Sequence, residues 1–167
     1  MRGVDPQGRR WWPMASLERL HTMILYTLWI FLWDDDLDGA DNNLSGLLEK
    51  VSAEELHDRT LAYLQYHLGM SPTDSGNAEP RAPPYAEIAK AAAEKLRTAC
   101  SKVQLNRLLK ELKLYMDCCL FEQGHLNGNT LPTVEEYWAG RYGSSAVSTY
   151  TALSELGSRY HVTLRAA

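Results

Sequence analysis

Four aspartates gather in the sequence WDDDLD, residues 33–38, directly after the strongly apolar run from Met23 to Trp33. The apolar spacing before them predicts a helix from about residue 15 to 38, so the acids fall at its C-terminal end. This placement is unfavourable, because that end of a helix already carries partial negative charge. Asp34 and Asp38, four residues apart, add a like-charge repulsion of about 0.2–0.5 kcal/mol. A bound cation would offset both costs.

Helix geometry suggests a role for each carboxylate. Asp34 and Asp38 lie one turn apart on one side, whereas Asp35 and Asp36 point about 100° and 200° away. Mg²⁺ commonly binds one or two carboxylates together with waters and phosphate oxygens. We therefore predict Asp34 as the main metal ligand and Asp38 as the second, with Asp35 bonded to a metal-bound water or a basic residue.

The alternative is that the acids simply form a solvated helix end that leads into a loop, which is the usual meaning of an acidic run. The aromatic and apolar residues that precede them favour the metal site, because they place the acids at the mouth of an apolar region. An acidic rim on an aromatic pocket suits a diphosphate attached to a hydrocarbon tail.

The elements that must position these acids are predicted to be helices throughout. Further helices are expected over 53–68, 85–100 and 102 to about 125, and one begins after Thr133 and continues past Tyr137, weakened by small residues at 140–145. Ser52, Ser101 and Thr133 suit N-caps, and Gly69 suits a C-terminal stop. The stretch 69–84 holds four prolines and two glycines and is predicted to be a flexible loop. The class is all-α, in one domain.

Composition excludes several functions. The 167 residues carry a formal net charge of -4, which gives no overall attraction for nucleic acid or anionic membrane. The longest apolar run is far shorter than the ~20 residues of a membrane span. The N-terminal residues lack the apolar core of a signal peptide. Three cysteines without a metal-binding spacing predict reduced thiols and a cytoplasmic location. The oligomeric state is not indicated.

Two segments carry a family resemblance. FLWDDDLD resembles the first aspartate-rich motif, DDxxD, of microbial class I terpene synthases, particularly the fungal-like sesquiterpene cyclases. The later stretch CLFEQGHLNGNTLPTVEEYWAGRYGSSAV resembles a second region of that family, in which Leu131-Pro132-Thr133, Glu135-Glu136-Tyr137 and Arg141 fall in register. The two segments lie over a hundred residues apart, in the order that the family shows.

This resemblance implies a helical terpenoid synthase bundle and a Mg²⁺-dependent lyase. The implied reaction ionises a prenyl diphosphate, with farnesyl diphosphate as the first candidate, and cyclises it to a sesquiterpene. Arg141 matches the arginine that senses the diphosphate, although a single arginine is more often a surface residue. The resemblance implies a helix break at Ser144 to Val147. It also implies contacts of the substrate with Trp33, Asp35, Ser144 and Ser145, and Trp29, Trp33, Tyr115 and Phe121 offer aromatic faces to a cation.

Departures from the family pattern leave alternatives open. The second metal motif, N-D-x-x-S-x-x-x-E, and the C-terminal Arg-Tyr pair do not occur in the 167 residues. We therefore expect residues 1–167 to be a single partial domain without the family's C-terminal helices, nearly inactive by itself. The two alternatives are an inert truncated fragment and a helical interaction protein whose aspartates only solvate a helix end.

Overall fold

The computed structural model describes residues 10–39, 52–71 and 78–157, and within these ranges it is helical without any strand. No helix of the described part combines the length and apolarity that a bilayer span needs. The all-α class predicted from the sequence is confirmed. The helices are α2 (Leu17–Gly39), α3 (Ala53–Leu68), α4 (Ala86–Ala99), α5 (Lys102–Asn127), α6 (Val134–Ser144) and α7 (Val147–Gly157).

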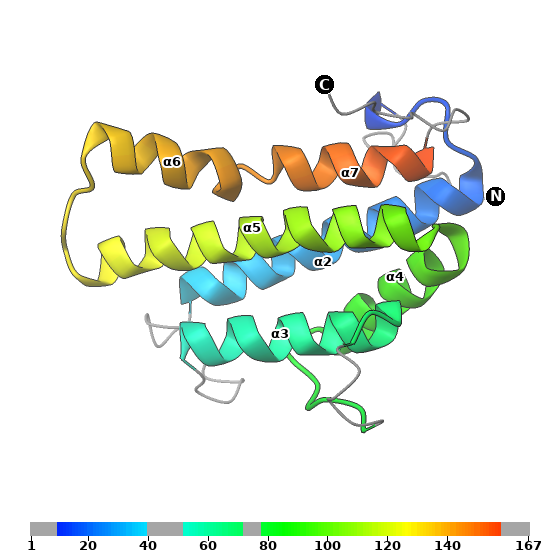
Figure 1. Ribbon diagram of the computed structural model, residues 1–167, viewed down its shortest axis with the longest axis horizontal. Coiled ribbons are helices and arrows are strands. Elements are labelled where there is room, and N and C mark those ends of the chain that lie inside the picture. The colour runs from blue at the N-terminus through cyan, green and yellow to red at the C-terminus, as the bar shows by residue number, and fades with distance from the viewer. Residues whose placement is uncertain (1–9, 40–51, 72–77, 158–167) are drawn as a thin grey trace.

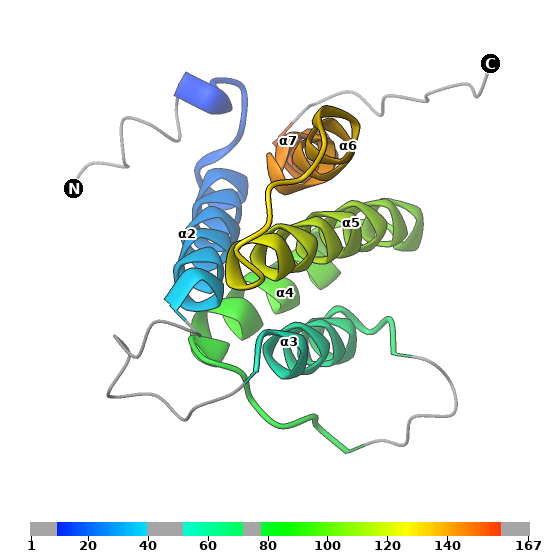
Figure 2. The same ribbon diagram turned by 90° about the vertical axis from the view of Figure 1, so that its left-hand side faces the viewer.

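Helix α5 is the centre of the arrangement. Figures 1 and 2 show α6 and α7 following one another along one side of α5, with α3 and α4 on the other side. Helix α2 lies beside α5 and contacts α4, α5 and α7. The acidic end of α2 is therefore placed against the long central helix, and the α6–α7 segment lies over both.

Local sequence signals explain where the helices begin and end. The side chains of Ser52, Ser101 and Thr133 each accept a hydrogen bond from the backbone N–H three residues later, so all three predicted N-caps are confirmed. At Ser101 and Thr133 the residue three positions on bonds back to the cap and completes a capping box. Gly69 adopts φ 68°, the left-handed conformation expected after α3.

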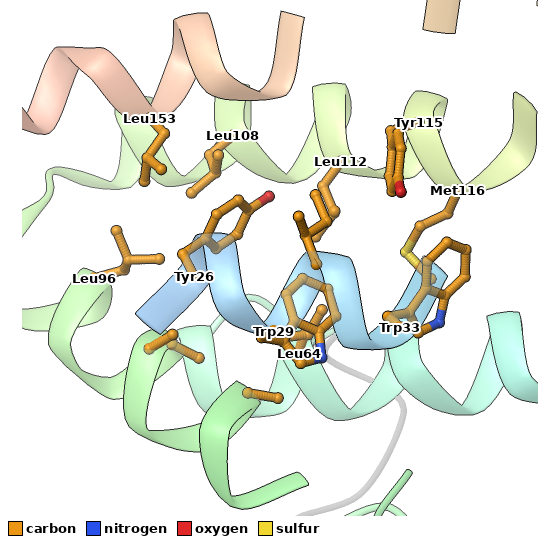
Figure 3. Packing of buried hydrophobic residues seen from close by; sticks show 14 of the residues in the cluster. Tyr26, Trp29, Trp33, Leu64, Leu96, Leu108, Leu112, Tyr115, Met116 and Leu153 are labelled. Carbon is orange, nitrogen blue, oxygen red and sulfur yellow. The ribbon is translucent and has the colours of Figure 1, made fainter. Parts of the chain in front are cut away.

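The core forms where the apolar run of α2 meets α5. Figure 3 shows Tyr26, Trp29 and Trp33 of α2 among side chains of α3, α4, α5 and α7. Trp29 is 1 % exposed and Trp33 is 2 % exposed, so one face of the apolar run is deeply buried, whereas Leu28 and Phe31 of the same run are exposed. Burial of such large rings anchors α2 firmly and fixes where its C-terminal acids lie.

The segment predicted as one weakened helix after Thr133 is two helices. The break falls at Ser145 and Ala146, and Ala146 has φ 57°. A left-handed conformation costs a non-glycine residue roughly 1–2 kcal/mol. The break lies within the residues at which the family resemblance implies one.

Part of the predicted flexible loop, residues 72–77, lies outside the described residues. The following residues lie against α3 and α4. Glu79 Oε1 is 3.0 Å from His67 Nε2, and Arg59 donates to the carbonyl of Ala82.

Gly143 allows α6 to approach α5 closely. A Cβ at Gly143 would lie 2.4 Å from Cys118 Sγ and 3.2 Å from the carbonyl oxygen of Leu114. We predict that Gly143→Ala lowers the free energy of unfolding by about 1–3 kcal/mol, the usual cost of overpacking. Urea unfolding followed by circular dichroism measures the change.

The matched control is Gly124→Ala. A Cβ at Gly124 in α5 meets nothing within 4 Å, so this change is expected to stabilise the protein by up to about 1 kcal/mol through helix propensity. Equal effects at the two glycines would contradict the close contact, and adding Cys118→Ala to Gly143→Ala should recover part of the loss.

Candidate active site

A cavity of about 460 Å³ opens where the end of α2, the middle of α5 and the α6–α7 break come together. Its walls combine aromatic rings with hydroxyl groups and a single carboxylate, that of Asp34. The volume lies within the range of small-molecule sites. The lining residues are Trp11, Trp12, Ile30, Phe31, Asp34, Tyr115, Ser144, Ser145, Ala146, Val147, Tyr150, Thr151 and Ser154.

Asp34 is half-buried in the cavity wall and is held from α5. The hydroxyl of Tyr115 donates to Asp34 Oδ1 at 2.7 Å, and Cys119 Sγ lies 3.8 Å from the same oxygen. Burial raises the pKa of Tyr115, so its hydroxyl keeps its proton and remains a donor. Burial likewise raises the pKa of Cys119 to about 12, which keeps this group a thiol. Asp34 Oδ1 therefore faces two protonated, neutral groups on α5.

The other aspartates differ in their surroundings. Asp38 is exposed and accepts a hydrogen bond from Gln123 Nε2, and its pKa is raised first by burial and then by the charge of Asp34. Asp36 is half-buried with Oδ2 unpaired, and burial and Asp35 raise its pKa. Asp35 is exposed. Crowding and partial burial thus disfavour the charged forms of Asp36 and Asp38.

The donor set would suit a hard divalent cation whose remaining ligands come from water and phosphate. Among the described residues, no three His, Cys, Asp or Glu side chains converge to enclose a metal ion. Asp34 and Asp38 nevertheless supply two carboxylates from one helix. Mg²⁺ is typically bound by one or two carboxylates and completed by waters and substrate phosphates, so these two residues could hold it together with a phosphate ligand.

Arg141 is exposed and lies in a polar cluster on the α5–α6 side. Its Nη1 is 3.8 Å from Glu122 Oε2 and 3.4 Å from Ser144 Oγ, and Ser144 donates to Glu122 Oε1 at 2.5 Å. Arg141 lines a second cavity of about 860 Å³ between α5, α6 and α7, not the cavity of Asp34. Ser145 lines both cavities and Ser144 lines the first, so these serines connect the arginine with the aspartate cavity.

The aromatic residues predicted to face a substrate are divided between core and surface. Trp29 and Trp33 lie in the core with their Nε1 atoms unpaired, and neither lines the aspartate cavity. Phe121 is exposed beside Gly140 of α6. Of the four, only Tyr115 lines the aspartate cavity, with its ring 5.8 Å from that of Trp33, centroid to centroid.

The aspartate cavity is also lined by aromatic residues that were not predicted from the sequence. Trp11 packs edge-on against Tyr150 with ring centroids 5.4 Å apart, and Trp12 Nε1 donates to Ser154 Oγ at 2.9 Å. The adjacent pair of tryptophans before Pro13 was a visible signal. Because these tryptophans are far from α7 in the sequence, their contacts with Tyr150 and Ser154 could not be predicted.

Comparisons with known proteins now identify the family. The model described as terpene synthase family 2, C-terminal metal binding, matches residues 26–166, so the chain belongs to this terpene synthase family. The sesquiterpene cyclase hepA of Aspergillus oryzae is 31% identical over 150 residues. That match covers 87% of this chain and 40% of the length of the relative. No solved structure matches the chain significantly.

The raised pKa of Asp38 predicts a pH-dependent stability. A folded-state pKa above the usual 3.8 means that the folded protein holds this proton more tightly, so stability falls as pH rises through the raised pKa. In a metal-free buffer we expect Asp38→Asn to be more stable than the wild type at pH 7. The difference should close as pH approaches the unfolded-state pKa. Urea unfolding at several pH values measures this difference in stability. An Asp38→Asn variant that is less stable than the wild type at pH 7 would contradict the unfavourable surroundings of the Asp38 carboxylate.

Proposed function

We propose that this chain provides the diphosphate-binding part of a Mg²⁺-dependent terpene cyclase, which ionises a prenyl diphosphate and cyclises the resulting cation. One observation carries the proposal. The carboxylate of Asp34 and the break between α6 and α7 face the same aromatic-walled cavity. The Aspergillus oryzae relative is a sesquiterpene cyclase, which supports farnesyl diphosphate as the first substrate to test.

Asp34 and Asp38 would hold the metal, with Asp35 beside them. When bound, Mg²⁺ supplies Lewis-acid stabilisation to the departing diphosphate. The start of α7 offers backbone N–H groups to the same anion, because the N-terminus of a helix favours negative charge. Ser144 and Ser145 add hydroxyl groups at this point of the cavity wall. The anion would thus lie between the cation held by the carboxylates of α2 and the donor groups of the α6–α7 break.

Arg141 is the cation best placed to reach the diphosphate from the neighbouring cavity. Its contact with Glu122 is long and exposed, and such surface pairs contribute about 0–1 kcal/mol. A diphosphate can therefore compete for the guanidinium, which binds phosphate oxygens through two parallel hydrogen bonds. Ser144 Oγ accepts from Arg141 and donates to Glu122, so movement of Arg141 would free an acceptor position on this oxygen while its bond to Glu122 stays.

The aromatic rings would stabilise the carbocation after ionisation. The rings of Trp12, Phe31, Tyr115 and Tyr150 line the cavity that contains Asp34. A ring face attracts a nearby cation, by about 2 kcal/mol or more where water is excluded. Trp33 does not line the cavity but packs against the ring of Tyr115, so it would support that ring instead of contacting the cation.

The two alternatives differ from this proposal in measurable ways. An inert fragment would bind Mg²⁺ and diphosphate but form no product. A helical interaction protein would bind neither. The half-burial of Asp34 and its bond to Tyr115 favour a site over a solvated helix end, because solvation alone needs neither.

The first test is Mg²⁺-dependent binding of inorganic diphosphate, measured by isothermal titration calorimetry. We expect the wild type to bind only with Mg²⁺ and Asp34→Ala to lose this binding, because the main metal ligand is removed. Glu54→Ala, an exposed acid in the first turn of α3, is the control and should bind like the wild type. Equal binding by both variants would refute the metal site.

The same samples, given farnesyl diphosphate and Mg²⁺, test turnover. We expect little volatile product from the 167 residues alone. Abundant cyclic product that disappears in Asp34→Ala would overturn this expectation of low activity and support the cyclase function.

The second test separates Arg141 from its surroundings. We expect Arg141→Ala to weaken diphosphate binding about 10- to 100-fold, from the ~1.5–3 kcal/mol of a hydrogen bond to a charged group. Glu122→Gln should strengthen binding, because it removes the competing carboxylate. Arg107→Ala, which lines the same larger cavity but pairs with Glu155, is the control. If both arginine variants lose affinity equally, Arg141 has no specific role.

A further inference from the structure

Three side chains on one face of α5 point at the acidic end of α2. Tyr115, Cys119 and Gln123 follow one another at intervals of four residues, so they form a row along the helix. The first two contact Asp34, and the third donates to Asp38. We call Tyr115, Cys119 and Gln123 the donor row.

The donor row runs along α5 in the same order as the two acids run along α2. Tyr115 and Cys119 contact Asp34, and Gln123, one turn beyond Cys119, contacts Asp38, one turn beyond Asp34. Tyr115 is 3 % exposed and Gln123 is 6 % exposed, which holds both donors in place through packing. The ring of Trp33 lies 5.8 Å from that of Tyr115 and supports it from the core side.

The hydrogen bonds also distinguish the two oxygens of Asp34. Tyr115 and Cys119 both contact Oδ1. A carboxylate fixed through one oxygen has a defined plane, and Oδ2 is then the oxygen that Asp34 presents to a cation. Without the donor, the side chain would be free to turn, and binding a cation would have to restrict that motion.

We propose that Tyr115 and Gln123 are positioning residues for the metal-binding carboxylates, with Tyr115 orienting Asp34 and Gln123 orienting Asp38. This inference rests on the proposed function, because it assumes that the two aspartates hold a divalent cation. Hydrogen-bond partners of metal ligands typically contribute 10- to 100-fold to metal affinity, and we expect about this loss when Tyr115 loses its hydroxyl.

The test compares two buried tyrosines, one whose hydroxyl donates to Asp34 and one whose hydroxyl has no hydrogen-bond partner. Tyr115→Phe removes the donor to Asp34. Tyr26→Phe is the matched control, because Tyr26 also lies on the α2–α5 core but its hydroxyl has no hydrogen-bond partner. Gln123→Met is a second variant of similar size that removes the donor to Asp38.

Mn²⁺ is the probe, and electron paramagnetic resonance counts the free ion with and without inorganic diphosphate. Urea unfolding in metal-free buffer measures stability separately. A 10- to 100-fold loss of Mn²⁺ affinity in Tyr115→Phe, with Tyr26→Phe unchanged, supports the proposal. A merely structural role would lower stability and leave the affinity of the folded protein unchanged, and this result overturns the proposal while the proposed function stands.

Two further outcomes are decisive. If Tyr115→Phe does not fold, Gln123→Met takes its place, and an unchanged affinity in that variant overturns the proposal. If the wild type binds no Mn²⁺ under either condition, the proposed function fails and the positioning roles fail with it. Mn²⁺ binding by the wild type therefore tests the proposed function, and the affinities of the variants test the positioning roles, in one experiment.

Discussion

The charge cluster at the C-terminal end of α2 is the constraint around which this structure is arranged. A helix end with partial negative charge carries four aspartates, and the pKa values of Asp36 and Asp38 are raised in consequence of burial and of their neighbours. Donors on α5 meet two of these acids, Asp34 and Asp38, and offset part of the cost. The hydrogen bond from Tyr115 to Asp34 joins residues 81 positions apart and ties the acidic end of α2 to the central helix.

The same helix α5 serves α6 on another of its faces. Gly143 lets α6 approach α5 so closely that a methyl group at this position would overlap Cys118. Gly143 directly precedes Ser144, so this contact holds the beginning of the α6–α7 break close to α5. The cavity lined by this break takes its carboxylate from a third helix, α2. The left-handed Ala146 in the break adds a local backbone cost, of the kind often found where structure serves a site.

Arg141 belongs to the same sequence motif as the serines of the α6–α7 break but does not line the same cavity as Asp34. It lies three residues before Ser144, yet its guanidinium contacts Glu122 and faces the larger cavity. Ser145, Val147 and Thr151 line both cavities. If a diphosphate draws Arg141 away from Glu122, residues of both cavities would contact the same ligand. The ion pair with Glu122 would then be the position of Arg141 before the ligand binds.

The sequence by itself determined the helical class, three N-caps and the end of α3, because each depends on residues close along the chain. It also indicated the family through two motifs. It could not place Tyr115 and Gln123 opposite Asp34 and Asp38, or Trp11 against Tyr150, because these contacts join distant segments. Nor could it place Trp33 behind the cavity wall and Arg141 in the neighbouring cavity. Local patterns define each helix, but the rotation and distance between helices follow from side-chain packing, and packing exists only in the tertiary structure.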